Sequence, residues 1–134
     1  RFDMAASLAH LDFDNVIHPR AVISRSAELG KGISILANVV CNASSKIGDH
    51  VILNTACIIE HDCRIGNAVH VSPGAVLAGG VSVCERSWIG AGAVIREGVR
   101  IGTDVVVGAG AVVIRDIADN SVVGGIPATE LRRS

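Results

Sequence analysis

The tetrapeptide Glu60-His61-Asp62-Cys63 gathers the side chains best suited to chemistry in this 134-residue chain. An imidazole can accept a proton near neutral pH, and an adjacent carboxylate can fix its tautomer and raise its basicity. The residues alone leave two interpretations open. His61 is either a general base supported by an acid, or a surface histidine beside two solvated carboxylates. It falls outside the apolar repeat of the chain, so it is expected to face outward in both cases.

A strict six-residue period runs through most of the chain. Every sixth residue from Ile17 to Val113 is Ile, Leu or Val, except Cys41, and a second series two residues earlier, from Ala21 to Ala111, is small or β-branched. Apolar residues at i and i−2 indicate a very short strand followed by a turn, and no apolar stripe occurs at helical spacing. Such strands bury a complete face only by stacking in register. The sequence therefore predicts an all-β fold, a parallel β-helix.

Three hexads make one triangular coil, because similar segments recur at every third hexad: SPGAVL from Ser72, GAGAVI from Gly90 and GAGAVV from Gly108. About five to six coils are expected. Gly79 follows His61 by one coil, so it should stack over the imidazole at ~4.8 Å. A glycine there would leave the ring uncovered and let a backbone N–H approach a reacting carbonyl, although a plain turn glycine fits equally well.

Composition limits the class of protein. A formal net charge of −1 gives no basic surface for nucleic acid. No apolar run approaches the ~18 residues of a membrane span, and no signal peptide heads the chain, so a cytoplasmic location is expected. Cys41, Cys57 and Cys63 occupy inward positions and are expected to be small buried hydrophobes in a reducing compartment. The role of Cys84, which lies outside the inward series, stays open.

The segment from Asn54 to Val83, NTACIIEHDCRIGNAVHVSPGAVLAGGVSV, closely resembles one branch of the hexapeptide-repeat acyltransferases, as do the following GAGAVI repeats and the V-x-G-x-P-A ending. This branch holds sugar O- and N-acetyltransferases of the sialic acid O-acetyltransferase type, including bacterial enzymes that N-acetylate UDP-4-amino-sugars. The resemblance covers residues 15–132. It implies a left-handed β-helix, homotrimers with active sites between subunits, and transfer of acetyl from acetyl-CoA to an amino-sugar or sialic-acid-type sugar.

The resemblance also implies roles for individual residues. The histidine of its Glu-His-acid-Cys motif is the general base, which falls on His61, supported by Asp62 or less well by Glu60. The stacking of Gly79 over His61, and not the resemblance, is the reason to expect that the Gly79 N–H donates to the oxyanion. Direct attack without an acetyl-enzyme is expected, because no cysteine forms a nucleophile–base pair with the histidine. His70, half a coil from His61, should lie on the opposite side of the prism. It would reach a neighbour's site and position substrate, or simply be an interface histidine.

Coenzyme A is expected along small residues that recur once per coil. A pantetheine arm can be held by backbone hydrogen bonds where no side chain intervenes, although tight prism corners also require small residues. The family ending has a lysine after Pro-Ala, where this chain has Thr129. Arg132 or Arg133 could replace that phosphate contact. The expected contacts are Gly79, Ala91, Gly108, Ala109, Ile126, Pro127 and Arg132.

The chain divides into three parts. Residues 1–14 do not follow the hexad and are expected to be the remnant of an N-terminal α/β sugar-binding module, which members of this branch usually have, or a linker. Residues 15–116 should form the β-helix. Residues 117–134 should form a tail that closes the coenzyme A site, ending in a frayed helical turn from Glu130 onward.

Other functions suit a β-helix less well. A zinc enzyme of the γ-type carbonic anhydrase kind needs a His-x4-His pair, which the five histidines do not supply, so no metal is expected. A trimerisation scaffold or ice-binding surface is also possible, although ice binding favours threonine rows and only Thr55, Thr103 and Thr129 occur. An acetyltransferase for serine would be expected to have long loop insertions. The particular sugar, and N- or O-acetylation, stay open.

Overall fold

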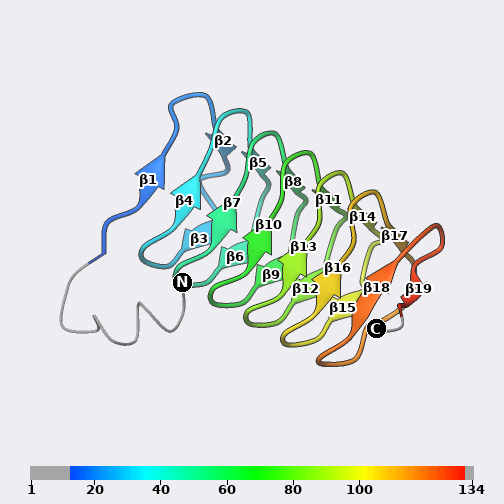
Figure 1. Ribbon diagram of the computed structural model, residues 1–134. Helices are drawn as coiled ribbons and strands as arrows, with labels where there is room; N and C mark the ends of the chain where they lie inside the picture. Colours follow the sequence, from blue (N-terminus) through cyan, green and yellow to red (C-terminus); the bar gives the residue numbers. More distant parts are fainter. Residues whose placement is uncertain (1–12, 132–134) are drawn as a thin grey trace.

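Short strands build the whole of the described structure. A computed structural model describes residues 13–131; residues 1–12 and 132–134 lie outside it, and with them almost all of the expected N-terminal module remnant. Within residues 13–131 the chain forms 19 strands and no helix (Figure 1). The strands lie in three sheets, which form the three faces of a prism.

The sheets differ in length. The eight-stranded sheet contains β1 (Val16–Ile17), β4 (Ser34–Ile35), β7 (Ile52–Leu53), β10 (His70–Val71), β13 (Trp88–Ile89), β16 (Val106–Val107), β18 (Val122–Gly124) and β19 (Thr129–Glu130). The six-stranded sheet contains β2 (Val22–Ile23), β5 (Val40–Cys41), β8 (Ile58–Ile59), β11 (Val76–Leu77), β14 (Val94–Ile95) and β17 (Val112–Val113). The five-stranded sheet contains β3 (Glu28–Leu29), β6 (Lys46–Ile47), β9 (Arg64–Ile65), β12 (Ser82–Val83) and β15 (Arg100–Ile101).

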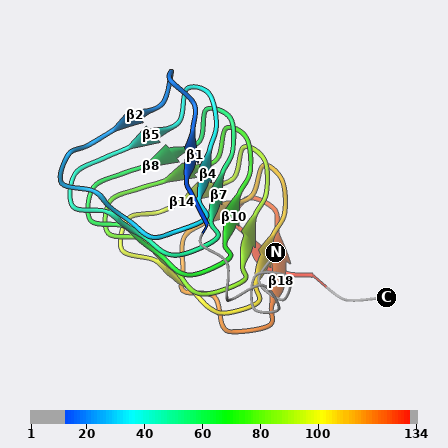
Figure 2. The same ribbon diagram turned by 90° about the vertical axis from the view of Figure 1, so that its left-hand side faces the viewer.

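Each strand pairs in parallel with the strand one coil away. His70 of β10, for example, is aligned with Ile52 in the coil before it and with Trp88 in the coil after it. In Figure 1 the chain rises along the front strands, passes over the top to the fainter strands behind, and returns along the bottom while the coils advance from left to right. This winding is left-handed. Figure 2 shows the coils one behind another. The predicted left-handed parallel β-helix is confirmed, with six strands, one per coil, in the six-stranded sheet.

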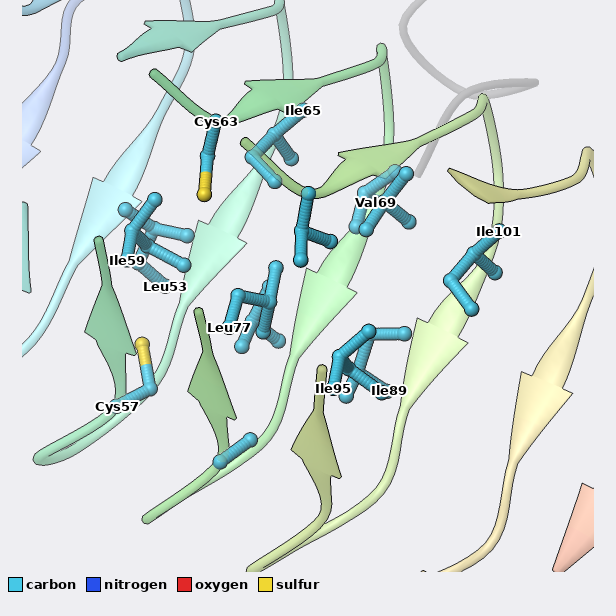
Figure 3. Packing of buried hydrophobic residues seen from close by; sticks show 14 of the residues in the cluster. Leu53, Cys57, Ile59, Cys63, Ile65, Val69, Leu77, Ile89, Ile95 and Ile101 are labelled. Atoms are coloured by element: carbon cyan, nitrogen blue, oxygen red, sulfur yellow. The ribbon is translucent and has the colours of Figure 1, made fainter. Parts of the chain in front are cut away.

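The two inward series form one continuous apolar core (Figure 3). Its members from Ile33 onward are almost completely shielded, whereas Ile17 in the first coil is 43% exposed. Cys41, Cys57 and Cys63 are buried and free, as predicted, and Cys84 is half-buried. Burial raises the pKa of the Cys41 thiol to about 11 and of the Cys57 thiol to about 12. Both side chains therefore remain neutral in the core.

The last coil is shorter than the others. Val106 is aligned with Val122, and Ile101 bridges to Ile117, so the register between neighbouring coils shortens by two positions. The shortening shifts the inward phase, so that the buried Val123, which lies twelve residues after Ala111 of the second inward series, is aligned with Val107 of the first. Strand β18 therefore continues the eight-stranded sheet beyond residue 116, where the hexad pattern stops.

The tail folds back on the end of the prism. β19 pairs antiparallel with β18, with Val123 aligned to Glu130. The expected helical turn from Glu130 onward is wrong at its first residue, which belongs to this strand; the rest of that segment lies mostly outside the described residues. Strand pairing wins there because the free edge of β18 offers backbone partners that a single helical turn would lack.

Candidate active site

His61 and Asp62 occupy the corner between β8 and β9. His61 Nδ1 lies 3.0 Å from Asp62 Oδ2, and both side chains are about two-thirds exposed, at 64% and 65%. Asp62 has a φ of 61°, in the left-handed region that Asp tolerates better than most residues. If Nδ1 carries the proton, it donates to the carboxylate and leaves the Nε2 lone pair facing outward. The arrangement suits an imidazole that accepts a proton at Nε2 while Asp62 fixes its tautomer through Nδ1.

Gly79 stacks on His61, as their separation by one coil predicts. The Gly80 N–H donates to the His61 carbonyl oxygen at 2.9 Å. A Cβ built on Gly79 would lie 2.6 Å from His61 Cε1 and 2.7 Å from Nε2. Any side chain at this position would therefore push the imidazole aside. The Gly79 N–H donates to no acceptor within residues 13–131, so it is available for an outside oxygen.

Glu60 differs from Asp62 in its surroundings. Its side chain is half-buried and makes no hydrogen bond or ion pair with any other residue in the described range. Its carbonyl oxygen, by contrast, accepts a hydrogen bond from the Ser45 hydroxyl at 2.8 Å. Of the two carboxylates that flank His61, the geometry thus joins Asp62 and not Glu60 to the imidazole.

His70 lies away from His61 within one chain. It belongs to β10 in the eight-stranded sheet, whereas His61 lies at the corner between the other two sheets. The His70 ring stacks on Trp88 with centroids 5.3 Å apart and an interplanar angle of 10°. Its Nε2 lies 3.2 Å from Asn54 Nδ2. The ring is thus held on the outer face of the sheet by two neighbours.

The sequence analysis did not single out Asn54 or Trp88. Trp88 follows His70 by one coil, the same relationship that places Gly79 over His61. Comparing outward positions along this row would have found it. Trp88 is 52% exposed, and its Nε1–H donates to Ser72 Oγ at 2.7 Å.

Of the expected coenzyme contacts, Gly79 lies at the His61 corner, whereas Ala91, Gly108 and Ala109 lie at another corner, between the eight-stranded and six-stranded sheets. Ala91 and Ala109 are exposed there, and Gly108 is half-buried. A Cβ on any of the following glycines at this corner would meet nothing within 4 Å: Gly74, Gly92 and Gly110. Earlier coils have Asn38 and Ala56 in the row of these glycines, so this row lacks side chains only in the last coils. Together with Ala91 and Ala109 beside it, the row forms a strip of small residues. A chain-like ligand could approach the backbone here.

The tail lies at the end of this strip. The Val112 N–H donates to the Gly125 carbonyl at 3.0 Å, and the Ala128 N–H donates to the Val112 carbonyl at 2.8 Å. Ile126 is 76% exposed, and its bond to Pro127 is cis. Arg132, the expected phosphate contact, lies outside the described residues.

Two general features complete the description. No group of three His, Cys, Asp or Glu side chains suited to a metal ion occurs within residues 13–131. Nor does this part of the chain contain a helix long and apolar enough to cross a membrane.

The repeat pattern identifies the family. Residues 44–79 and 80–115, more than half of the chain, match the bacterial transferase hexapeptide (six repeats) family. The chain therefore belongs to the bacterial hexapeptide-repeat transferases. No curated protein sequence matches it.

Several solved structures are similar over nearly the whole chain. PerB from Caulobacter crescentus, solved in complex with CoA and GDP-perosamine, is 45% identical, with a TM-score of 0.92, 98% of this chain and 63% of that chain covered. The acetyltransferase domain of PglB from Neisseria gonorrhoeae, solved with acetyl coenzyme A, is 42% identical, with a TM-score of 0.92 and coverage of 97% and 63%. WeeI from Acinetobacter baumannii is 30% identical, with a TM-score of 0.92 and coverage of 97% and 65%. The present chain thus spans less than two thirds of each of these chains.

Proposed function

We propose that this chain is the transferase part of an N-acetyltransferase that moves acetyl from acetyl-CoA to a nucleotide-activated amino-sugar. The observation that carries the proposal is the exposed His61 imidazole, bonded through Nδ1 to Asp62 and left uncovered by Gly79. PerB supports the substrate classes, since it was solved with CoA and an activated amino-sugar. Structures of that perosamine N-acetyltransferase with one histidine replaced by asparagine or alanine were also solved with CoA and GDP-perosamine.

His61 acts as the general base. The sugar amine attacks the thioester carbonyl carbon while Nε2 of His61 takes the proton that the amine loses. Asp62 stabilises the imidazolium that forms. The Gly79 N–H donates to the carbonyl oxygen as it becomes an oxyanion. When the tetrahedral intermediate collapses, the C–S bond breaks and the departing sulfur of coenzyme A takes the proton back from His61.

The pantetheine arm lies along the corner of the last coils where the side chains are glycine or alanine. Ala91, Gly108 and Ala109 leave the backbone accessible there. The tail closes the end of the strip with Ile126 and Pro127, and Arg132 contacts a phosphate of the coenzyme. The bonds between Val112 and the tail support this placement, since they hold residues 125–128 beside the strip.

The active site forms between subunits of a homotrimer. Within one chain His61 and the coenzyme strip lie at different corners of the prism, and His70 lies on a third surface. A neighbouring prism brings its His61 corner to the strip and to His70, which then positions sugar or thioester. Exposed apolar side chains on the outer face of the eight-stranded sheet, including Trp88 and Val106, support burial of this face against another subunit.

Replacing His61 tests the proposal directly. His61→Asn should lower kcat for acetyl transfer to GDP-perosamine or a related 4-amino-sugar by about 10²- to 10⁴-fold, because the proton acceptor is lost. Acetyl-CoA binding, measured by calorimetry, should persist. His18→Asn, an exposed histidine outside the site, is the matched control. Full activity of His61→Asn would contradict the base assignment. Absence of both binding and transfer in the unaltered protein would favour the scaffold alternative.

A further inference from the structure

Inward residues that lie one coil apart form a row, and one such row has side chains that can donate a hydrogen bond only next to the candidate site. At successive coils the row below the His61 corner holds Ala27, Ser45, Cys63, Val81 and Val99. Ser45 and Cys63, its two members whose side chains can donate a hydrogen bond, are both completely shielded from solvent. A buried hydroxyl offers less to packing than a methyl-bearing side chain and must be hydrogen-bonded to avoid a desolvation cost. Their occurrence in an otherwise apolar row therefore needs a specific reason.

The Ser45 hydroxyl bridges the turn that holds His61. Its O–H donates to the Glu60 carbonyl at 2.8 Å, and its oxygen accepts from the Cys63 N–H at 3.3 Å. Those two backbone groups flank His61 and Asp62. At the same corner they bond directly in three other coils, from Ala27 N–H to Ser24 O at 3.1 Å, from Val81 N–H to Ala78 O at 3.4 Å and from Val99 N–H to Arg96 O at 3.3 Å, but not between Ser45 and Asn42. No direct bond of this kind joins Cys63 N–H to Glu60 O in the described structure, so the hydroxyl takes its place.

The Cys63 thiol repeats the contact one coil later. Its Sγ–H donates to the Ala78 carbonyl oxygen at 3.2 Å, immediately before Gly79. The direct bond across that turn, from Val81 N–H to Ala78 O, is long at 3.4 Å. Burial raises the pKa of the Cys63 thiol above its ordinary value, so the thiol keeps the proton that it donates. Ser45 and Cys63 thereby connect the two turns that hold His61 and Gly79.

We infer that Ser45 and Cys63 are positioning residues, which fix the backbone of the His61 and Gly79 turns so that the imidazole keeps its place over the glycine. The inference rests on the proposed function where it is tested by kcat for acetyl transfer, but not where it is tested by the ¹⁵N shifts of the His61 ring. A tightened or shifted turn would move His61 relative to the attacking amine. A misplacement of about 1 Å at a reacting centre can cost about 10²-fold in rate.

The chain supplies its own control. Ser87 makes the same bridge at a different corner, where its hydroxyl donates to the Gly102 carbonyl and accepts from the Val105 N–H at 3.0 Å. The turn that it bridges contains no residue of the candidate site. Ser87→Ala therefore removes an equivalent buried hydroxyl, with a comparable loss of stability, while leaving the His61 turn untouched.

The experiment compares Ser45→Ala with Ser87→Ala. Ser45→Ala should lower kcat by about 10- to 100-fold with KM for acetyl-CoA nearly unchanged, since the interaction acts on the reacting geometry and not on ground-state binding. Ser87→Ala should retain kcat at a similar thermal midpoint. Ser45→Cys, which keeps a donor as Cys63 does in the next coil, should restore most of the activity. Cys63→Val, which adopts the next residue type of its row, should lower kcat as Ser45→Ala does.

A second readout does not depend on turnover. The ring ¹⁵N shifts of His61 report which nitrogen holds the proton, and they should change in Ser45→Ala but not in Ser87→Ala. Equal losses of kcat in the two serine variants, or unchanged His61 shifts in Ser45→Ala, would overturn the inference. If the unaltered protein transfers no acetyl group, the proposed function fails, and the His61 shifts alone then decide the positioning role. If Ser45→Ala does not fold, Cys63→Val is compared with Ser87→Ala by the same criteria.

Discussion

A methyl group on Gly79 would lie 2.7 Å from His61 Nε2, the ring nitrogen that does not face Asp62. The two residues occupy consecutive layers of one prism corner, joined by the bond from the Gly80 N–H to the His61 carbonyl. The corner thus holds the imidazole through a carboxylate at Nδ1, and no hydrogen bond joins Nε2 to another residue of 13–131. A backbone N–H without a partner in residues 13–131 lies next to it. His61 and Gly79 therefore place a proton acceptor and a hydrogen-bond donor side by side, as acyl transfer requires.

Gly79→Ala should abolish most activity while preserving the fold. The added methyl would displace the imidazole and cover the N–H, so kcat should fall by about 10²- to 10³-fold, as when an oxyanion donor is removed. The backbone of Gly79 is not left-handed, so alanine fits it without strain. Steady-state kinetics and thermal melting check both parts. Glu97→Ala, one coil further along the same corner, should behave as the unaltered protein. Near-normal kcat in Gly79→Ala would remove Gly79 from the site.

Ala109→Leu should weaken acetyl-CoA binding. A larger side chain would occupy the exposed strip of the last coils, and KM for acetyl-CoA should rise by about tenfold or more as backbone contacts to the pantetheine arm are lost. Ala37→Leu places the same side chain in the same corner row four coils earlier, outside the strip, and should leave KM unchanged. Calorimetric titration with coenzyme A checks the difference. Equal affinities in the two variants would show that the coenzyme lies elsewhere.

Trp88→Arg should disrupt both assembly and activity. Trp88 projects from the outer face of the eight-stranded sheet, and a charge there would oppose burial of that face against another subunit. Light scattering after gel filtration should show monomer mass, together with loss of acetyl transfer. Val94→Arg, on the six-stranded sheet and similarly accessible, should remain a trimer. An active trimer in Trp88→Arg would place the subunit contact on a different face.

Stability should fall in alkaline solution because of the buried thiols. Burial raises the pKa of Cys41 to about 11 and of Cys57 to about 12 from an ordinary value of 9.0. Their stabilising contribution is complete below pH 9 and is lost as the pH rises through the folded-state values, because the unfolded chain releases these protons first. Between pH 8 and pH 10 each thiol should cost about 1 kcal/mol of unfolding free energy.

Urea unfolding at several pH values measures this loss. Cys57→Ala should show a shallower decline between pH 8 and pH 10 than the unaltered protein, since one titrating group is gone. Val51→Ala, which removes buried apolar volume without a thiol, should be less stable at every pH but keep the original slope. Identical slopes in Cys57→Ala and the unaltered protein would contradict the thiol explanation.

Much of the architecture was predictable because one physical requirement repeats along the chain. Residues such as Ile59 and Leu77 are buried wherever the hexad places them, since each short strand has one inward position and the next coil covers it. The stacking of Gly79 over His61 followed from the same period. The prediction of the β-helix stopped at residue 116 because the last coil is shorter than the rest. A six-residue period cannot predict where the chain changes to a different spacing.

The sequence by itself determined the prism and the neighbours in adjacent coils up to residue 116, because the spacing of apolar side chains fixes both. Only the tertiary structure decided which carboxylate lies against the His61 imidazole, since Glu60 and Asp62 are equally near in sequence and the Asp62 backbone alone is left-handed. It also revealed that Ser45 takes the place of a turn hydrogen bond beneath His61. These features depend on backbone dihedral angles and on hydrogen-bond directions, which a pattern of apolar residues does not encode.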